Sequence, residues 1–416
     1  MSFRTVLILF FVLLIIGEIF SYRGIKSLAA SLSPKMKAFI FSGYWLWTLL
    51  VFALVAYSFF NRAAFDKIGR ANTAFVIIGL FLMNFSFKSI FGLFHGGNEL
   101  FHVVKGFFSA REVYSTSTGM SRSQFLTMTG LALASLPFVG LLYGMLRGRY
   151  DFTVFRESIA FTNLPKSFDG KKIVHLSDMH LGSFPLDTNA IQRAVEKVNA
   201  LEPDYIFFTG DMVNERSEEA KAWVSTIKQL KAKHGKYSVL GNHDYGDYYS
   251  KWDGDIVAKK QDVNALTKLQ KEMGFTLLRN ESLRLEHNNE YIRLIGMENW
   301  GVGRFSKYGN ISVAMRETKE DEFQIMLSHD PSHWDEQVLE KTTVELALAG
   351  HTHGFQFGIE IPGLKWSPVQ FRYPRWAGLY RQGKQCLYVN RGFGYIGYAG
   401  RVGMPPEITL IELKQA

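Results

Sequence analysis

Five short polar segments hold the residues of this sequence that are best suited to metal binding and catalysis. Each one follows an apolar run that is typical of a buried strand. They are Asp178-Met179-His180, Gly210-Asp211-Met212-Val213-Asn214, Gly241-Asn242-His243-Asp244, Ser328-His329-Asp330 and Gly350-His351-Thr352-His353-Gly354. In an open α/β sheet, ligands collect beyond the carboxyl ends of the strands. The pattern therefore predicts that all five segments meet at one edge of a sheet.

These segments supply enough donor atoms for two metal ions. Two divalent ions about 3.5 to 4 Å apart need roughly eight donor positions, one of them shared, and a bridging oxygen. The predicted ligands are Asp178, His180, Asp211, Asn242, His329, His351 and His353, with one carboxylate bridging. No thiolate takes part, so Mn, Fe, Zn and Mg are all admissible. We expect Gly210, Gly241 and Gly350 to let the backbone turn sharply and approach the ions closely.

The charge of such a centre indicates chemistry on phosphorus. Two dications and two carboxylates leave a net charge of about +2, which attracts an anionic phosphoryl group. A hydroxide that bridges the metals can then attack the phosphorus in line with the leaving group. The sequence thus predicts a phosphohydrolase.

The order of the five segments resembles the calcineurin-like metallophosphoesterase superfamily, from about Lys171 to the C-terminus. The resemblance implies an α/β (α+β) fold of two mixed β-sheets sandwiched between helices. Its motifs assign Asp178, His180 and His353 to the first metal, Asn242, His329 and His351 to the second, and Asp211 to the bridge. His243 would stabilise the transition state or protonate the leaving oxygen, and Asp244 would orient its ring.

Three later segments resemble a bacterial membrane-anchored subgroup of that superfamily. They are residues 374–381 (PRWAGLYR), 388–392 (YVNRG) and 405–409 (PPEIT). The subgroup includes lipid-directed phosphodiesterases and pyrophosphatases, so the resemblance implies a phosphorylated small-molecule or lipid substrate.

Four apolar stretches precede the chemistry-bearing part, at residues 3–20, 37–60, 73–94 and 124–146. Each is long enough to cross a bilayer as a helix of about 20 residues. We expect a membrane domain of four transmembrane helices over residues 1–149 and a catalytic domain over residues 150–416; a cleaved signal peptide is the alternative for the first stretch. Glu18 and Lys88 are charged residues near the ends of these stretches, so we expect Glu18 at the interface and Lys88 to snorkel.

The basic charge belongs to the membrane part. Residues 1–150 hold 14 Lys/Arg and 4 Asp/Glu, whereas residues 151–416 hold 33 and 34, so net charges of +10 and −1 make up the total of +9. This asymmetry favours anionic lipid headgroups, and no nucleic-acid partner is expected. The predicted location is the cell inner membrane as a multi-pass protein. Basic residues are equally frequent on both sides, so the side of the catalytic domain stays undecided.

Short apolar runs alternate with amphipathic stretches after residue 150, which predicts parallel strands first and a second, mixed sheet later. The predicted strands are residues 172–177, 204–209, 236–240, 275–279, 291–296, 323–327, 343–348, 385–389 and 407–413. The predicted helices are residues 188–200, 217–231, 256–273 and 332–340.

Residues 361–406 contain seven basic side chains, no acidic one and many aromatics. Either these residues form a rim that guides an anionic headgroup, with Arg375 and Arg391 as substrate-binding candidates, or the aromatics pack while the arginines face water. We expect the single cysteine, Cys386, to be a buried apolar side chain. The remaining histidines, His95 and His102 included, are interpreted as structural or solvated.

The predicted function is a membrane-anchored, metal-dependent phosphohydrolase that cleaves a phosphoester or pyrophosphate bond. A nuclease or cyclic-nucleotide phosphodiesterase is the alternative enzyme. A non-catalytic membrane sensor that retains the fold is the alternative from another class.

Overall fold

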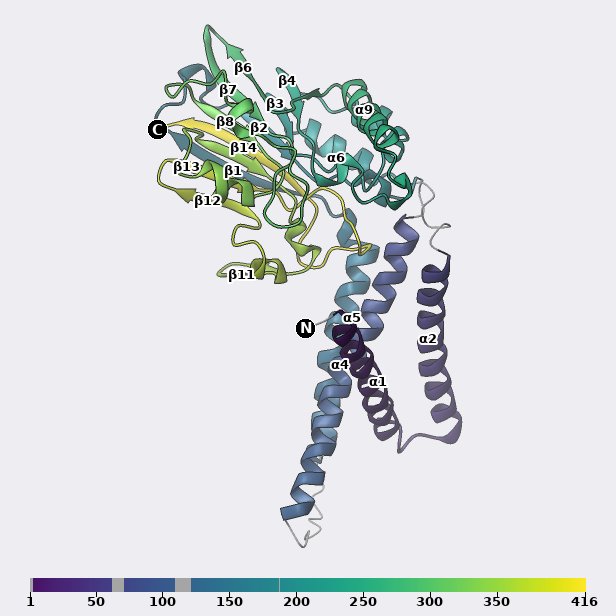
Figure 1. The fold of residues 1–416 in the computed structure, drawn as a ribbon. Coiled ribbons are helices and arrows are strands. Elements are labelled where there is room, and N and C mark those ends of the chain that lie inside the picture. Colours follow the sequence, from purple (N-terminus) through teal and green to yellow (C-terminus); the bar gives the residue numbers. More distant parts are fainter. Residues whose placement is uncertain (1–2, 62–70, 109–120, 187) are drawn as a thin grey trace. The chain divides into compact units, whose positions relative to one another are not determined.

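The computed structural model describes residues 3–61, 71–108, 121–186 and 188–416, and the chain divides into two compact units. Among the described residues, 3–61, 74–108 and 121–145 form the helical unit, and 71–73, 146–186 and 188–416 form the sheet unit. Figure 1 shows the helical unit in purple and blue and the sheet unit mainly in teal, green and yellow. The basic residues that flank the predicted spans include Arg62, Lys67, Arg70 and Arg111, which lie outside the described residues.

Long helices make up the described part of the helical unit. They are α1 (Phe3–Leu28), α2 (Pro34–Phe60), α4 (Ala71–Phe108) and α5 (Arg122–Leu146). Within the residues that the structure describes, three segments are long and apolar enough to cross a membrane, namely Pro34–Phe60, Ala71–Lys105 and Arg122–Tyr150. Helix α4 continues past the predicted end of its span, so His95 and His102 lie on a helix rather than in a loop.

Local side-chain bonds set where two of these helices begin. Ser33 accepts a hydrogen bond from the Met36 amide at the start of α2, with Pro34 in the first helical position. At the start of α5, the Ser121 hydroxyl and the Gln124 amide side chain each bond the other residue's backbone N–H at 3.1 Å. This reciprocal pair is a capping box, which satisfies donors that a helix start leaves open.

Glu18 and Lys88 are paired with each other, contrary to the prediction from sequence that Lys88 snorkels. Lys88 is only 6% exposed, and its Nζ lies 2.7 Å from Glu18 Oε2 and also donates to the Thr48 hydroxyl. Lys88 therefore does not snorkel. A buried ammonium requires such a partner because its desolvation is costly, and sequence alone did not show that α1, α2 and α4 bring these residues together.

The sheet unit contains two six-stranded mixed sheets, which confirms the predicted fold class. The first has the order β1-β14-β2-β3-β4-β5 and the second β12-β13-β9-β8-β7-β6. The strands of the first are β1 (Thr153–Phe161), β2 (Lys172–Leu176), β3 (Tyr205–Phe208), β4 (Gly235–Ser238), β5 (Thr276–Leu277) and β14 (Glu407–Gln415). Those of the second are β6 (Glu281–His287), β7 (Glu290–Gly296), β8 (Gln324–Leu327), β9 (Leu346–Ala349), β12 (Gly378–Gln382) and β13 (Gln385–Val389). In the first sheet, β2 to β5 are parallel and β14 is antiparallel to β2.

A single core lies between the two sheets. Ile173 and Phe207 of the first sheet belong to the same buried cluster as Leu294, Ile325 and Leu348 of the second. The alternate residues Met326 and Ala347 are buried in a second cluster, on the other face of their strands. Burial of both faces explains why the central strands are short apolar runs that can be recognised in the sequence. Cys386 is buried in this core, as predicted.

Helices flank the sheets, and Figure 1 shows α6 and α9 beside β3 and β4. They are α6 (Ala190–Asn199), α7 (Glu218–Lys221), α8 (Val224–Ile227), α9 (Ile256–Glu272) and α10 (Ile311–Ala314). The prediction of one helix over residues 217–231 is wrong, because α7 and α8 are separate. The predicted helix over residues 332–340 is a π-helical turn at Trp334–Val338. A small hairpin, β10 (Ile359–Ile361) and β11 (Leu364–Trp366), was not predicted.

Candidate metal centre

All five polar segments follow the carboxyl ends of strands, namely β2, β3, β4, β8 and β9. The turns are tight: Gly210 has φ +93°, and a Cβ there would lie 2.3 Å from the Gly241 amide nitrogen. A Cβ on Gly350 would lie 1.9 Å from the Ser177 hydroxyl and 2.2 Å from Asp178 Oδ2. Glycine is therefore required at positions 210 and 350, because the neighbouring loops leave no room for a side chain.

One group of candidate ligands consists of Asp178, His180 and His353, whose donor atoms lie within 4.8 Å of one another. His180 Nε2 lies 3.1 Å from His353 Nε2, and His353 Nε2 lies 3.2 Å from Asp178 Oδ1. All three residues are buried. Two imidazole nitrogens and a carboxylate oxygen that converge in this way form a donor set suited to a divalent ion.

A second group consists of Asp211, His329 and His351. His329 Nε2 lies 3.1 Å from Asp211 Oδ2, and His351 Nδ1 lies 3.2 Å from His329 Nε2. Asn242 joins this group, because its Oδ1 lies 2.8 Å from His351 Nδ1. Asp211 Oδ2 also lies 3.6 Å from His180 Nε2, so this carboxylate contacts both groups. The seven predicted ligands are thus brought together.

The histidine rings are held by bonds at the nitrogen that faces away from the centre. His180 Nδ1 lies 3.0 Å from Asn214 Oδ1, and His329 Nδ1 lies 2.7 Å from the Thr209 carbonyl. His351 is turned the other way, with its Nε2 2.9 Å from the Tyr373 hydroxyl. Partners of this kind fix the tautomer of a metal ligand and free the opposite nitrogen.

Burial and charge set the protonation of the centre. Burial lowers the pKa of His180 and of His351, so both rings favour the neutral form that binds a metal. Burial alone would lower the pKa of His329, but the adjacent Asp211 carboxylate raises it to about 10. Protons and metal ions therefore compete for His329 and Asp211.

His243 lies beside the first group, 4.9 Å from the His180 ring between centroids. Its Nδ1 lies 2.6 Å from the Asn214 carbonyl, which leaves Nε2 for another partner. Asp244 does not orient this ring, contrary to the role that the resemblance implied. Its carboxylate instead accepts backbone N–H groups of Asp211, Met212 and Gly241 at 2.8 to 2.9 Å, so it shapes the loop that carries Asp211.

The two arginines expected at a substrate rim already have partners. Arg391 is 2% exposed and binds Glu407 and Glu360 through separate nitrogens at 2.7 and 2.6 Å. Arg375 forms an ion pair with Asp335 and lies over the Trp334 ring. These carboxylates neutralise both guanidinium groups, so the positions of Arg375 and Arg391 do not support the predicted contact with an anionic headgroup.

Two further residues support the centre and were absent from the predicted site. Asn214 ends the same segment as Asp211, so its place in that motif was a usable signal. Tyr373 bonds His351 and lies 3.4 Å from Asp330 Oδ2, but it comes from a distant loop. No local pattern in the sequence distinguishes Tyr373 from the other aromatics around it.

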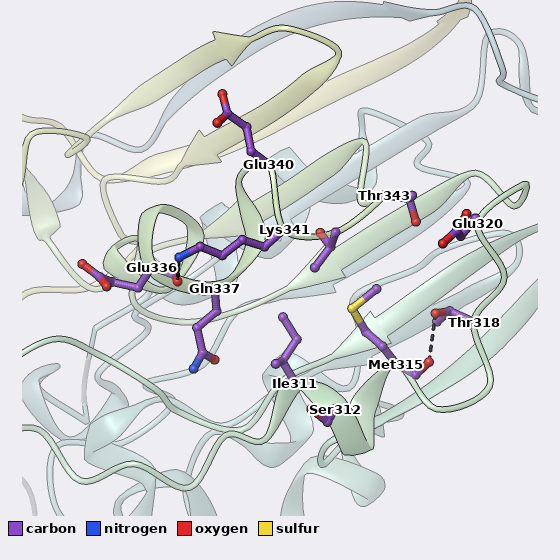
Figure 2. Close-up of a pocket in the computed structure, with 11 residues that line it drawn as sticks. Ile311, Ser312, Met315, Thr318, Glu320, Glu336, Gln337, Glu340, Lys341 and Thr343 are labelled. Carbon is purple, nitrogen blue, oxygen red and sulfur yellow. Dashed lines mark hydrogen bonds between the residues drawn. The ribbon is translucent and has the colours of Figure 1, made fainter.

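Figure 2 shows a different part of the sheet unit, a surface cavity of about 840 Å³. Its lining includes Glu320, Glu336 and Glu340 and a single basic residue, Lys341, but none of the candidate ligands. Three carboxylates would repel an anionic phosphoryl group. The metal centre is therefore the better candidate for phosphoester chemistry.

Two family models match the chain. The calcineurin-like phosphoesterase family matches residues 171–355, and the family described as a probable calcineurin-like phosphoesterase, transmembrane domain, matches residues 3–149. The uncharacterized metallophosphoesterase YkuE of Bacillus subtilis is 31% identical over 71% of this chain and 98% of its own length. A Danio rerio transmembrane protein with a metallophosphoesterase domain is 27% identical over 82% of this chain and 73% of its own. The UDP-2,3-diacylglucosamine pyrophosphatase LpxG of Chlamydia trachomatis is 28% identical over 60% of this chain and 86% of its own.

Proposed function

Because this chain belongs to the calcineurin-like phosphoesterase family and is a membrane-associated phosphoester hydrolase, we propose that its substrate is a lipid-linked phosphoester or pyrophosphate. We propose the seven clustered residues as ligands of two divalent ions. The observation that carries this proposal is the position of Asp211, whose Oδ2 lies 3.1 Å from His329 and 3.6 Å from His180. One carboxylate that contacts both groups is suited to bridge two ions.

Divalent ions held by these ligands would supply an activated water nucleophile and neutralise charge on the phosphoryl oxygens. The chain's own residues would supply the rest. His243 would donate through Nε2 to the phosphoryl or leaving oxygen, because its Nδ1 is held by the Asn214 carbonyl. Asp244 would keep the Asp211 loop in place through its backbone bonds.

A lipid substrate is favoured by the apolar helices that accompany the metal centre in one chain. The name of the LpxG relative, a pyrophosphatase acting on UDP-2,3-diacylglucosamine, supports the same class. We further propose that residues 1–149 form a membrane domain with four spans, in the cell inner membrane, and that residues 150–416 form the catalytic domain.

The test uses the full-length protein in lipid nanodiscs, stripped of metal and reloaded with Mn²⁺. Elemental analysis should find bound metal, and a panel of a monoester, a diester, a phospholipid and a nucleotide-linked lipid should show hydrolysis of a lipid member. Asp211→Ala should bind less metal, and its kcat/KM should fall at least about a thousandfold. Asp253→Ala is the matched control, because Asp253 is also an aspartate with positive φ but is exposed.

Full activity in Asp211→Ala would overturn the metal assignment, as would folded protein without stoichiometric metal under every loading condition. Stoichiometric metal without turnover would favour the non-catalytic sensor instead. Hydrolysis confined to polynucleotides or cyclic nucleotides would favour the alternative enzyme.

A further inference from the structure

The β10–β11 hairpin of the sheet unit turns its apolar face outward. The strands pair Ile361 with Leu364 and Glu360 with Lys365, so successive residues alternate between two faces. The apolar face carries Ile359, Ile361 and Leu364, which are 46%, 58% and 48% exposed. A hairpin on a water-soluble surface ordinarily has the opposite arrangement, with its apolar face on the core.

The polar face of the hairpin is fixed to the body of the unit. Glu360 accepts two hydrogen bonds from Arg391, at 2.6 and 3.0 Å, and Arg391 is itself buried against Glu407. On the other strand, the Lys365 ammonium donates to the Ala377 carbonyl and lies 5.0 Å from the centre of the Trp376 ring. These bonds tie both charged side chains to the body of the unit, although Glu360 and Lys365 themselves stay exposed. The hairpin is therefore anchored through its polar face, and its apolar face is left without such partners.

Two more exposed apolar side chains lie in the segments that flank the hairpin in the sequence. Phe355 is 62% exposed and Phe371 is 83% exposed, and they come from short segments on either side of the hairpin. The Ser367 hydroxyl donates to the Gly354 carbonyl at 2.8 Å, which ties these two segments together. We name Phe355, Ile359, Ile361, Leu364 and Phe371 the apolar patch. Figure 1 shows β11 outside the two large sheets.

The apolar patch is continuous with the metal centre along the chain. Phe355 follows the candidate ligand His353 by two residues, and Phe371 precedes Tyr373, whose hydroxyl bonds His351. Arg372, next to Phe371 in the sequence, is exposed and adds a positive charge beside the apolar patch. Exposed aromatic and aliphatic side chains beside a basic residue are typical of surfaces that enter the headgroup region of a bilayer.

We propose that the apolar patch docks the sheet unit on the lipid bilayer and so holds the metal centre at headgroup level. The bilayer is the occupant that the chain itself supplies, because only residues 147–152 separate the last apolar helix from β1. Arg391 thereby acquires a role: it anchors the hairpin in the docking orientation. The proposal deepens the proposed function, but docking requires neither metal nor turnover.

The test places an environment-sensitive fluorophore on the patch of the full-length protein in liposomes. Ile361→Cys can be labelled selectively, because the sole native cysteine, Cys386, is buried. Lys384→Cys is the matched control: it is an exposed residue in the β12–β13 turn, which precedes β13 and so lies at the sheet edge opposite the metal centre. Lipids that carry a quencher should quench the label at 361 at least threefold more than the label at 384, and iodide in the water should do the reverse.

Equal quenching at the two positions would overturn the proposal. So would a crosslink between Ile361→Cys residues of two copies without lipid quenching, which would assign the patch to a second copy of the chain. These readouts do not involve hydrolysis, so they can fail while the proposed function stands. As a second measurement, Ile361→Glu with Leu364→Glu should lower kcat/KM for a bilayer substrate about tenfold and leave a small soluble ester unaffected; an equal effect on both substrates would contradict docking.

Discussion

Strained backbone is concentrated at the candidate ligands. Asp178, His180, Asp211, His351 and His353 all have φ between +45° and +70°. This conformation costs a residue other than glycine about 1 to 3 kcal/mol, and it persists only where surrounding bonds enforce it. Here those bonds come from the site itself: the His351 amide donates to Asp178 Oδ2 at 2.9 Å, and the His180 amide donates to the Asp211 carbonyl. The loops that carry the two groups therefore hold each other.

His243 is the residue for which binding and chemistry can be separated. It is not among the clustered ligands, so His243→Ala should retain both metal ions by elemental analysis. Loss of its hydrogen bond to the reacting phosphoryl group should lower kcat about a hundredfold to a thousandfold. His287→Ala, at the partly exposed end of β6, is the control and should keep wild-type kcat. Loss of metal in His243→Ala would instead make this residue part of the metal cage.

His333 should make the stability of the sheet unit depend on pH. Burial lowers its pKa from 6.5 to about 4, so between those values the unfolded chain binds the proton and the folded chain does not. The free energy of unfolding should therefore fall as the pH falls from about 6.5 to 4, by about 3 kcal/mol for this residue. His333→Gln, measured by denaturant unfolding in detergent, should lose that part of the slope. Parallel profiles for the two proteins would contradict this assignment.

At the scale of elements, the centre depends on five strands that end at the same edge. Their turns leave no space between neighbouring loops, as the contact from Gly210 to Gly241 shows. A methyl group placed there must push two ligand-bearing loops apart, so stability and metal binding are coupled at this position.

Substitution of two glycines with positive φ separates steric contact from backbone preference. Gly210→Ala should lower the free energy of unfolding by more than about 3 kcal/mol and weaken metal binding, because strain is added to a clash with the backbone. Gly383→Ala is the control, since Gly383 has φ +58° but nothing within 4 Å of the added Cβ. Gly383→Ala should lower the free energy of unfolding by about 1 kcal/mol and leave metal binding intact. Similar losses in both variants would mean that the loops can move apart.

The sequence predicted the buried strands and the ligands because both depend on local patterns. An apolar run that ends in a polar segment identifies β2, β3, β8 and β9 without knowledge of their neighbours. Strand β1 was missed because it is half-exposed and lacks such a run. The β10–β11 hairpin was missed because each of its strands has only three residues, too few to show an alternating pattern.

Pairing partners were the part of the site and of the fold that sequence could not supply. Arg391 looked available for substrate until the structure placed it between Glu360 and Glu407, which are 31 and 16 residues away. Glu18 and Lys88 are likewise 70 residues apart. Interactions over such separations are set by tertiary packing, whereas the ligand motifs are set within a few residues.

At the scale of the whole molecule, the chain has two compact units, and our proposal assigns membrane association to the helical unit and catalysis to the sheet unit. A catalytic unit tethered to a bilayer meets lipid substrates at an effective concentration far above that of a protein free in solution. The tether should therefore matter for bilayer substrates and not for soluble ones, even though no residue of the metal centre lies in the helical unit.

A protease site in the connection between the two units tests whether the tether matters only for bilayer substrates. A site-specific protease sequence inserted between Leu146 and Arg147 lies one residue past the boundary of the two units, so cleavage should release residues 147–416 without cutting a strand. After cleavage in liposomes at submicromolar protein, kcat/KM for a bilayer-borne substrate should fall at least tenfold, because the effective concentration from the tether is lost. Activity on a soluble ester should be unchanged, which shows that the released unit remains folded.

The uncleaved insertion protein treated with inactive protease is the control. Equal activity on the bilayer substrate before and after cleavage would mean that docking through the apolar patch alone keeps the metal centre at the membrane.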